Sequence, residues 1–349
     1  MTSQTSIFDL SLEELTDYLD QWGEQPYRAK QIWHGVYQRL VTDSDALTDL
    51  PIELRARIKE TLSFSNLVET DRQHSEDGST IKTLFTLPDE EKVETVLMHY
   101  EKRRTVCIST QVGCALGCAF CATGQMGFRR NLSSGEIIEQ VIHYARQLTA
   151  QKEQITNIVV MGMGEPFHNY DAVLPALVRL NHPDGFNLGA RRITISTVGL
   201  VPGIKRFTRE KWQYKLAVSL HAATNALRDQ LLPVNHRYPL EVLIPACKEY
   251  IHQSGRRITF EWALIRDVND GLDQADALAD LIHGMNCHVN LIPLNPTADF
   301  KGDAANKNIA DRFVNRLSSR GISCTMRLRR GIKIQAGCGQ LATKGKEMS

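Results

Sequence analysis

The sequence predicts an α/β fold built from alternating strands and helices. Short β-branched runs followed by segments with helical apolar spacing recur about six times after residue 100. The 349 residues, 42% hydrophobic and 23% charged, are also enough to bury a large core. Such alternation means parallel strands joined by helical crossovers. An open doubly wound sheet and a barrel both satisfy this pattern, and the alternation alone does not choose between them.

Residues 1–65 predict a small helical accessory domain that precedes the alternating part. A capping box at Ser11 opens the first helix, and Gly23 is placed to end it. Further helices are expected at 28–40 and 51–62, each with an apolar face and several basic side chains. These cations could meet the phosphates of a nucleic acid, and a solvated helix face explains them equally well.

Residues 66–100 change to the period-two pattern of strands. The runs TIKTLFTL and KVETVLMHY flank a Pro-Asp turn at 88–91, which predicts an antiparallel strand linker. Glu94 lies in the second run and, taken by itself, would pass for an exposed strand residue.

Three cysteines with the spacing Cys-x-x-x-Cys-x-x-Cys, Cys114, Cys118 and Cys121, occupy a predicted strand-to-helix loop. A strand is expected at 105–110, and a capping box at 133–136 opens the next helix. A structural zinc site commonly takes four ligands from two separated pairs, whereas this triplet stands alone. Three thiolates suit an iron–sulfur cluster with one iron left open to bind a small molecule. The alternative is an ordinary loop or a partial zinc knuckle.

The remaining alternation follows this cysteine loop. Strands are expected at 155–161, 192–197, 216–220, 257–265, 288–292 and 324–328, and helices at 172–180, 240–254, 272–283 and 306–320. Polar residues follow the carboxyl ends of several of these strands, where parallel barrels place their active sites. They are the segment GMGEP at 162–166, Ser196, Ser219, His221 and Asn295. Each can hydrogen-bond a small ligand, although GMGEP alone also fits a turn with a surface glutamate.

The composition sets limits on location and partners. A net charge of +1 gives no overall sign of a nucleic-acid partner, so any RNA binding must come from local basic patches. There is no basic leader, apolar signal region or long apolar run, so we expect a soluble, cytoplasmic protein without membrane contact. The 8 cysteines are too few for a disulfide scaffold and suit a reducing compartment.

The cysteine motif after a first strand resembles that of the radical S-adenosylmethionine (SAM) superfamily. The run QVGCALGCAFCATGQMGFRRNL, together with GMGEP, SLHA at 219–222, LIPLNP at 291–296 and GCGQL at 337–341, further resembles the RlmN/Cfr family. Members of that family methylate carbon atoms of adenine in RNA. The matching segments extend from Val93 to Leu341, which is most of the chain. The resemblance implies a partial (βα)6 radical SAM barrel over 101–330, followed by a C-terminal tail at 331–349.

The resemblance also assigns the cofactors. Cys114, Cys118 and Cys121 would hold a [4Fe-4S] cluster, whose open iron binds SAM. The residues implied in SAM binding are Gly164, Glu165, Ser196, Ser219, Leu220, His221 and Asn295. Two SAM molecules would be used for each methylated product.

By the same resemblance, Cys338 accepts a methyl group from one SAM and becomes S-methylcysteine. A second SAM is cleaved to a radical that activates this methyl group for addition to the adenine. Cys107 would be the resolving thiol, Glu94 the candidate proton acceptor, and a Cys107–Cys338 disulfide would form as the product leaves. A radical route suits this substrate because C2 and C8 of adenine are poor nucleophiles. Without the resemblance, both cysteines would be unremarkable thiols.

The implied partners are 23S rRNA and tRNA, an electron donor such as a flavodoxin or ferredoxin system, and a thiol reductant. We expect a monomer. Candidates for contact with RNA phosphates are Arg103, Arg104, Arg129, Arg130, Arg327, Arg329 and Arg330. Solvated surface charge is the competing explanation for these basic residues.

We therefore predict a radical SAM enzyme that methylates C2 of an adenosine in 23S rRNA and in tRNA. Methylation of C8 in 23S rRNA, as in the antibiotic-resistance branch of the family, is the close alternative. Another radical SAM reaction, or an iron–sulfur or zinc protein that binds RNA without catalysis, would be compatible with parts of the sequence.

Overall fold

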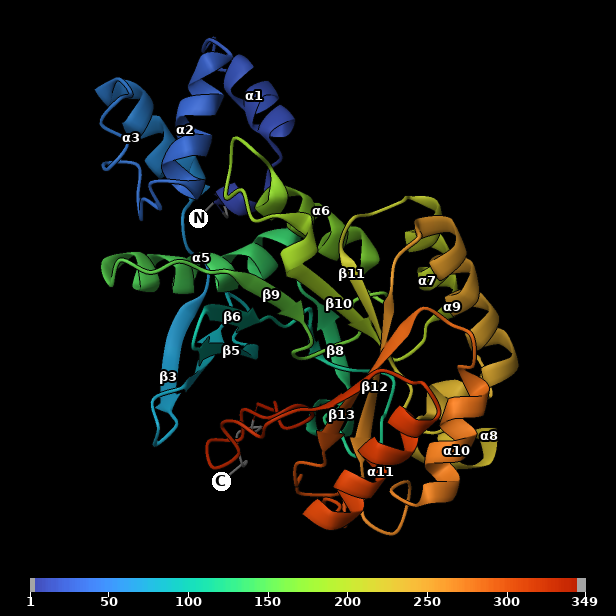
Figure 1. Cartoon of the computed structure of the whole chain (residues 1–349). Helices are drawn as coiled ribbons and strands as arrows, with labels where there is room; N and C mark the ends of the chain where they lie inside the picture. Colours follow the sequence, from blue (N-terminus) through green and yellow to red (C-terminus); the bar gives the residue numbers. More distant parts are fainter. Residues whose placement is uncertain (1–3, 344–349) are drawn as a thin grey trace.

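One ten-stranded sheet organises the computed structural model, which describes residues 4–343. Its strand order is β14-β13-β12-β11-β10-β9-β6-β5-β4-β3, and the neighbours from β6 to β14 pair in parallel. The parallel strands are β6 (Arg103–Cys107), β9 (Asn157–Val160), β10 (Ile193–Thr197), β11 (Lys215–Ser219), β12 (Ile258–Leu264), β13 (Cys287–Pro293) and β14 (Cys324–Met326). The order ends at β14 on one side and continues into antiparallel strands on the other, so the parallel part is an open, partial barrel (Figure 1).

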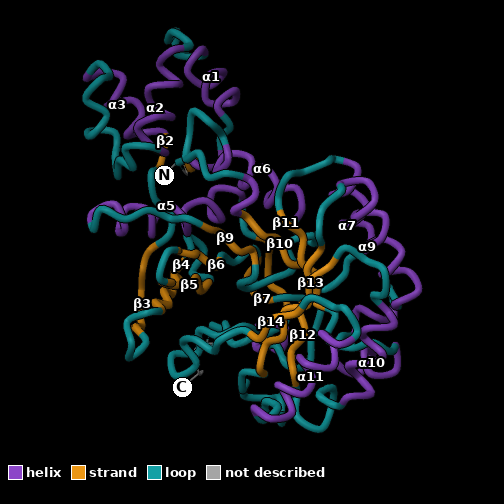
Figure 2. The backbone as a smooth tube through the Cα atoms, viewed as in Figure 1, coloured by secondary structure: helices purple, strands orange, loops and turns teal. Residues whose placement is uncertain are grey.

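Helices follow the strands from β6 to β13, which gives the six predicted βα units. These helices are α5 (Ser134–Ala150), α6 (Tyr170–Asn181), α7 (Val201–Arg209), α8 (Asn225–Leu231), α9 (Leu240–Ser254), α10 (Leu272–Leu281) and α11 (Lys307–Ser319). Figure 2 shows them around the outside of the strands. The alternation and most element positions were predicted correctly, whereas the helices α7 and α8 were not predicted.

The strands expected as a linker extend the barrel sheet. They are β3 (Val68–His74), β4 (Thr80–Thr86) and β5 (Lys92–Tyr100), all antiparallel, and β5 pairs directly with β6. This pairing places Val96 opposite Cys107. The first barrel strand is therefore held between an antiparallel neighbour and a parallel one, β9.

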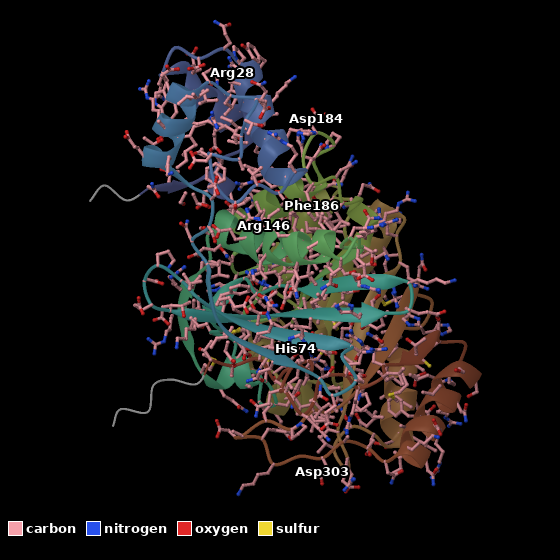
Figure 3. All side chains as sticks on the ribbon, turned by 90° about the vertical axis from the view of Figure 1, so that its left-hand side faces the viewer. Arg28, His74, Arg146, Asp184, Phe186 and Asp303 are labelled. Carbon is pink, nitrogen blue, oxygen red and sulfur yellow. The ribbon has the colours of Figure 1, made fainter. Side chains whose placement is uncertain are left out.

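The accessory region consists of α1 (Leu12–Asp20), α2 (Tyr27–Tyr37) and α3 (Ile52–Thr61), and the short strands β1 (Thr5–Ser6) and β2 (Leu62–Ser63) pair beside them. The predicted capping box is present, because the Ser11 side chain accepts from the backbone of Glu14 and that glutamate accepts from Ser11. Arg146 of α5, labelled in Figure 3, donates to the carbonyls of Leu40 and Val41. These bonds join the accessory region to the barrel.

The cysteine loop contains more structure than predicted. The expected strand at 105–110 is interrupted: β6 ends at Cys107, and β7 (Gln111–Gly113) begins a separate ribbon with β8 (Phe128–Asn131). The short helix α4 (Ala122–Gln125) lies between these two strands, and the predicted capping box at Ser133 then opens α5. Within residues 4–343, no helix is long and apolar enough to cross a membrane.

Candidate active site

A cavity at the carboxyl ends of the barrel strands brings most of the predicted site residues together. It contains about 990 Å³ of space free of protein atoms, its open mouth included. The predicted residues that line it are Cys114, Cys118, Cys121, Gly164, Glu165, Ser196, Ser219, His221, Asn295 and Cys338. These residues come from every part of the chain after residue 110, and the parallel strands place them at one edge of the barrel.

The β7–β8 ribbon shapes the cysteine loop. The backbone of Cys114 donates to the carbonyl of Gly127 over 2.9 Å, which closes the loop at its base. Gly113 has a φ of +73°, and a Cβ atom there would lie 1.8 Å from the Gly127 oxygen. Glycine is therefore required for this closure.

The cysteine thiols lie in an environment of low polarity. Burial raises the pKa of the Cys114 thiol to about 12 and raises that of Cys118 as well. The guanidinium of Arg228 opposes the shift at Cys118, and this arginine is fully buried. Within residues 4–343 it donates to neutral oxygens alone, namely the carbonyls of Val198, Ser219 and Leu220 and the Asn235 side chain. Its positive charge thus faces the loop without a carboxylate partner among these bonds.

Glu165 is held by backbone donors at the edge of the cavity. Its carboxylate accepts from the N–H groups of Val198 over 2.8 Å and Phe167 over 3.0 Å. Burial nevertheless raises its pKa to about 7, because these bonds compensate only part of the lost hydration. A cationic ammonium group placed in the cavity would favour the ionised form of Glu165.

The glycines around Glu165 are required by the packing of the chain. A Cβ atom on Gly162 would lie 2.6 Å from the Ile108 carbonyl, and one on Gly164 would lie 2.5 Å from the Gln111 side chain. Gly164 also has a φ of +99°. These glycines allow β9 to approach the chain after β6, and this close packing, more than the approach of a ligand, explains them.

His221 is fixed in one orientation. Its Nδ1 accepts from the backbone N–H of Ala263 over 2.8 Å, and Asn269 donates to its carbonyl. Burial lowers its pKa to about 3, so the ring is neutral and the proton is on Nε2. His221 is therefore a preset hydrogen-bond donor at the cavity.

Asn295 offers an unused acceptor. Its Oδ1 atom is buried without a hydrogen-bond partner among residues 4–343, while its Nδ2 donates to the Cys338 carbonyl over 3.1 Å. Such an atom is satisfied by a ligand or by water. Leu220 differs from the other predicted SAM residues, because its side chain is fully buried in the core and does not line the cavity.

The C-terminal segment is docked on the cysteine loop. Gly339 and Leu341 accept through their carbonyls from the Ala122 backbone over 2.7 Å and the Thr123 hydroxyl over 2.6 Å. These bonds hold the segment so that the exposed thiol of Cys338 lies at the cavity. Nη1 of Arg327 lies 3.7 Å from its sulfur. The nearby sulfur raises the pKa of Arg327. The predicted carrier is thus paired with a cation that we had assigned to RNA.

Cys107 lies beside Cys338 but outside the main cavity. Both cysteines line an adjoining cavity, together with Val96, Tyr100 and Arg327. Burial, and next the neighbouring Cys338, raise the pKa of the Cys107 thiol to about 12. Both cysteines have free thiols in this structure. The two predicted partners of the disulfide are therefore neighbours.

Glu94 is buried rather than exposed as the strand pattern alone suggested. Its carboxylate pairs with Lys82 over 2.8 Å, and both side chains are less than a tenth exposed. The other carboxylate oxygen accepts from the backbone N–H of Ala342 over 3.0 Å. Burial raises its pKa. Glu94 therefore anchors the tail that carries Cys338, and it does not line either cavity.

The candidate RNA-binding arginines fall into two groups. Arg104 pairs with Glu153, Arg129 with Glu91, and Arg130 with Asp89 and Glu136. The remaining candidates, Arg103, Arg327, Arg329 and Arg330, have no carboxylate within 4 Å in the described part of the chain. Only this second group has charge left for an anionic partner.

The residues present fit a [4Fe-4S] cluster and SAM. Within residues 4–343, no three His, Cys, Asp or Glu side chains converge as ligands of one metal ion. A cubane cluster does not require such convergence, because each of its cysteines binds a different iron. The three cysteines line one cavity with Glu165, and the orphaned Asn295 oxygen lies there as well.

Sequence reasoning missed Lys82, Arg228 and Glu261. Glu261 is buried in β12, accepts from Asn290 over 2.8 Å, and lines the cavity. A charged residue inside an apolar strand run, such as Glu261 in ITFEWAL, was the available signal, since buried charges are rare without a partner.

Comparisons with known proteins agree with this geometry. The family model described as the ribosomal RNA large subunit methyltransferase N-terminal domain matches residues 5–63, and that of the radical SAM superfamily matches residues 108–283. A protein of Chloroflexus aurantiacus, named "Probable dual-specificity RNA methyltransferase RlmN", is 47% identical over 97% of this chain and 93% of its own length. "Dual-specificity RNA methyltransferase RlmN 1" of Myxococcus xanthus is 46% identical over 98% of this chain and 96% of its own length.

A solved structure shows the same fold. The crystal structure of a radical SAM methyltransferase from Sphaerobacter thermophilus matches with a TM-score of 0.94 and 50% sequence identity. The match covers 97% of this chain and 99% of that one.

Proposed function

The chain belongs to the RlmN family of radical SAM RNA methyltransferases, and from this we propose that it methylates C2 of an adenosine in 23S rRNA and in tRNA, with Cys338 as methyl carrier. One observation carries the proposal. The cysteine triplet, the polar residues predicted to hold SAM and Cys338 all line one cavity. A methyl carrier must reach both its donor and its acceptor, and this position is suited to both.

The residues of the chain have distinct roles in this proposal. Cys114, Cys118 and Cys121 hold the cluster, which supplies one-electron reduction of SAM when bound. Glu165 receives the ammonium group of SAM, and His221 donates from Nε2 to an acceptor on the same ligand.

Cys338 attacks the methyl group of the first SAM as a thiolate. The C–S bond to Cys338 forms as the bond between methyl and the sulfonium sulfur breaks, and S-adenosylhomocysteine leaves. Cys107 lies beside Cys338 in the adjoining cavity, which supports its role as the resolving thiol. A Cys107–Cys338 disulfide would require a thiol reductant after each product.

The bonds of Glu94 support a positioning role as well as proton transfer. Glu94 forms a buried ion pair with Lys82 and accepts from the Ala342 backbone, so it holds the tail against β5. Val96, two residues further along this strand, lines the Cys107 cavity. A carboxylate with a raised pKa can accept a proton if the tail moves and exposes it.

The further partners follow from this chemistry. We propose an electron donor of the flavodoxin or ferredoxin class, a cytoplasmic location with the RNA substrates, and action as a monomer. No membrane contact is required for any of these steps.

The test is mass spectrometry of RNA after anaerobic reaction of cluster-loaded protein with SAM, reductant, and unmodified 23S rRNA fragments or tRNA transcripts. We expect 2-methyladenosine in both RNAs. Appearance of 8-methyladenosine instead would show that the regiochemistry is wrong. A zinc-loaded protein without iron or sulfide would favour an RNA-binding protein without catalysis.

Replacing Cys338 by alanine tests the carrier. We expect Cys338→Ala to form no methylated RNA while it still produces 5′-deoxyadenosine. The matched control is Cys324→Ala, because Cys324 lies in β14 and lines neither cavity. Methylation at wild-type yield by Cys338→Ala would disprove the carrier role.

A further inference from the structure

A second and larger opening lies at the amino-terminal end of the barrel. It contains about 2200 Å³ of space free of protein atoms, its open mouth included, and is lined by the beginnings of the parallel strands. Arg103 and Lys215 begin β6 and β11, Arg257 directly precedes β12, and Arg191 lies two residues before β10. In a parallel barrel these positions meet at the end opposite the catalytic loops. We call this opening the basic basin.

The basin has a strong excess of positive charge. Its cationic lining residues are Arg103, Arg191, Lys215, Arg256, Arg257, Arg327 and Arg330, and its only carboxylate among the described residues is Glu261. Glu261 is 4% exposed and already accepts from Asn290. The basin therefore concentrates positive potential on a protein whose net charge is only +1.

Most of these cations keep their charge available for a ligand, whereas Arg327 already faces the Cys338 sulfur and the Glu261 carboxylate. Within residues 4–343, none of the seven has a carboxylate within 4 Å, whereas arginines on the outer helices, such as Arg206 and Arg316, are paired. Two of the basin cations are preorganised, because Arg103 and Arg330 lie 4.9 and 4.6 Å from the ring centroid of Tyr100. Unpaired guanidinium groups held in place suit bidentate binding of phosphate.

The basin adjoins the catalytic cavity. Met161, Glu261 and Arg327 line both spaces. Arg327 also lies 3.7 Å from the sulfur of Cys338. A group that entered from the basin would therefore pass Arg327 and reach the predicted methyl carrier.

The docked tail and the cysteine loop cover part of the opposite end of the barrel. There the tail bonds to Ala122 and Thr123 of the cysteine loop, and Leu341 is only 5% exposed. A cluster held by that loop would occupy this end further. The basin therefore offers a second opening to the barrel, at the end that the tail and the cysteine loop leave free.

We propose that the basic basin is the entrance for RNA: its cations bind the phosphates flanking the target, and the adenine enters the barrel from this amino-terminal end. The inference rests on the proposed function for the identity of the nucleic acid. An adenine must leave its stack to react. The side chain of Leu328 is 82% exposed at the rim of the basin, where an apolar side chain can stack on the base next to the gap.

The test compares two triple variants that each remove three positive charges. The basin variant is Arg191→Gln, Arg256→Gln, Arg257→Gln. The control variant is Lys205→Gln, Arg209→Gln, Lys248→Gln, whose positions are exposed on α7 and α9 and outside the basin. The equilibrium binding of a tRNA transcript is measured for both variants and the wild type from about 50 to 200 mM salt.

We expect the basin variant to reduce the slope of log K against log salt by about 2 to 3, since each lost phosphate contact contributes about 0.7 to 0.9. The control should keep the wild-type slope to within about one contact. Equal losses in the two triple variants would overturn the proposal, because binding would then follow net charge rather than the basin. An unchanged slope in the basin variant would also overturn it.

A second readout separates this inference from the proposed function. S-methylation of Cys338 by SAM needs no RNA, so the basin variant should form S-methylcysteine at the wild-type rate. Loss of methyl transfer to RNA with normal S-methylation is the expected result.

If the wild type forms no methylated RNA at all, the proposed function fails, and the salt slopes still decide whether the basin binds RNA. Binding of polyglutamate that depends on the three arginines, without binding of RNA, would instead assign the basin to an acidic protein and overturn the proposal.

Discussion

The contact between Arg327 and Cys338 is the feature of the site that a single substitution tests most directly. The guanidinium lies 3.7 Å from the sulfur, and a positive charge at that distance attracts a thiolate when one forms. Since the thiolate is the reactive form of cysteine, we expect Arg327→Gln to slow alkylation of Cys338 by iodoacetamide about tenfold, which corresponds to about 1.4 kcal/mol. Peptide mass spectrometry over a time course measures the rate.

The control for this prediction lies two residues away. Arg329 donates to the carbonyl of Leu294 over 2.8 Å and has no hydrogen bond with Cys338 within residues 4–343. Arg329→Gln should therefore leave the alkylation rate near that of the wild type. Equal slowing by both variants would mean that loss of positive charge in general, rather than the Arg327 contact, controls the thiol.

His143 predicts a pH dependence of stability that is independent of the active site. It lies on α5, and burial lowers its pKa from 6.5 to about 4. The unfolded state therefore binds a proton below about pH 6.5 while the folded state does not, so stability falls as pH decreases from 6.5 to 4. The free energy of unfolding changes by at most about 1.4 kcal/mol per pH unit for one group.

Urea denaturation across this pH range should show a weaker pH dependence of the free energy of unfolding for His143→Phe, whose ring can occupy the same contact with Phe85. Parallel slopes for the two proteins would contradict this assignment.

Sequence reasoning worked for residues that have a local signal. The cysteine triplet was found by its spacing. Ser196, Ser219, His221 and Asn295 lie at predicted strand ends, but their predicted role in SAM binding came from the family resemblance. The structure brings all of them to one cavity. Lys82, Arg228 and Arg327 could not be assigned in this way. Their roles depend on the residues that pack against them from other elements of the fold. Lys82 of β4, for example, pairs with Glu94 of the neighbouring strand β5.

At the scale of elements, the docked tail is held by few bonds and should respond to the loss of one. The Thr123 hydroxyl is 3% exposed and donates to the Leu341 carbonyl over 2.6 Å. Thr123→Val keeps the shape and removes this bond, which destabilises the docked tail by about 1 kcal/mol. We expect about fivefold faster hydrogen exchange in peptides that cover 337–342.

The matched control is Thr208→Val. Thr208 is equally buried at 3% exposure and donates to Ile204 within α7, far from the tail in sequence. This variant should lose similar stability without faster exchange in 337–342. Faster exchange at the tail in both variants would attribute the effect to general destabilisation.

The elements that sequence reasoning found are those with a long periodic pattern. The long helices such as α9 and the strands β4 and β5 match their predicted ranges closely. The helix α7 was missed because it begins Val-Pro-Gly, which indicates a turn, and α8 has only 7 residues. The β7–β8 ribbon was missed because each of its strands has 4 residues or fewer, too short to show alternation.

At the scale of the molecule, helix α5 joins the accessory region to the barrel. The Asp9 carboxylate of the accessory region accepts from the Gly135 backbone over 2.6 Å at the start of this helix. One turn further, Glu139 is 5% exposed and accepts from the Ser6 hydroxyl and from the backbone N–H groups of Asn66 and Leu67. The two carboxylates fix both ends of the accessory region, because Asn66 and Leu67 begin the connection to β3.

Glu139 therefore predicts how firmly the two parts are joined. In Glu139→Gln one acceptor oxygen becomes an NH₂ group, which faces either the two backbone donors or the Ser6 hydroxyl. Because a buried donor is then left unsatisfied, we expect the free energy of unfolding to fall by about 1 to 3 kcal/mol, measured as a lower urea midpoint. Glu153→Gln is the control, since its pair with Arg104 is partly exposed and should contribute less than about 1 kcal/mol.

Trp33 reports on the accessory region, where it is buried in α2, and Trp262 reports on the barrel from β12. The two reporters are followed separately, in variants that each retain one of these two tryptophans. In Glu139→Gln, the accessory region should then unfold at a lower urea concentration than the barrel. If both reporters still move together, and no further than in Glu153→Gln, then Glu139 does not join the accessory region to the barrel.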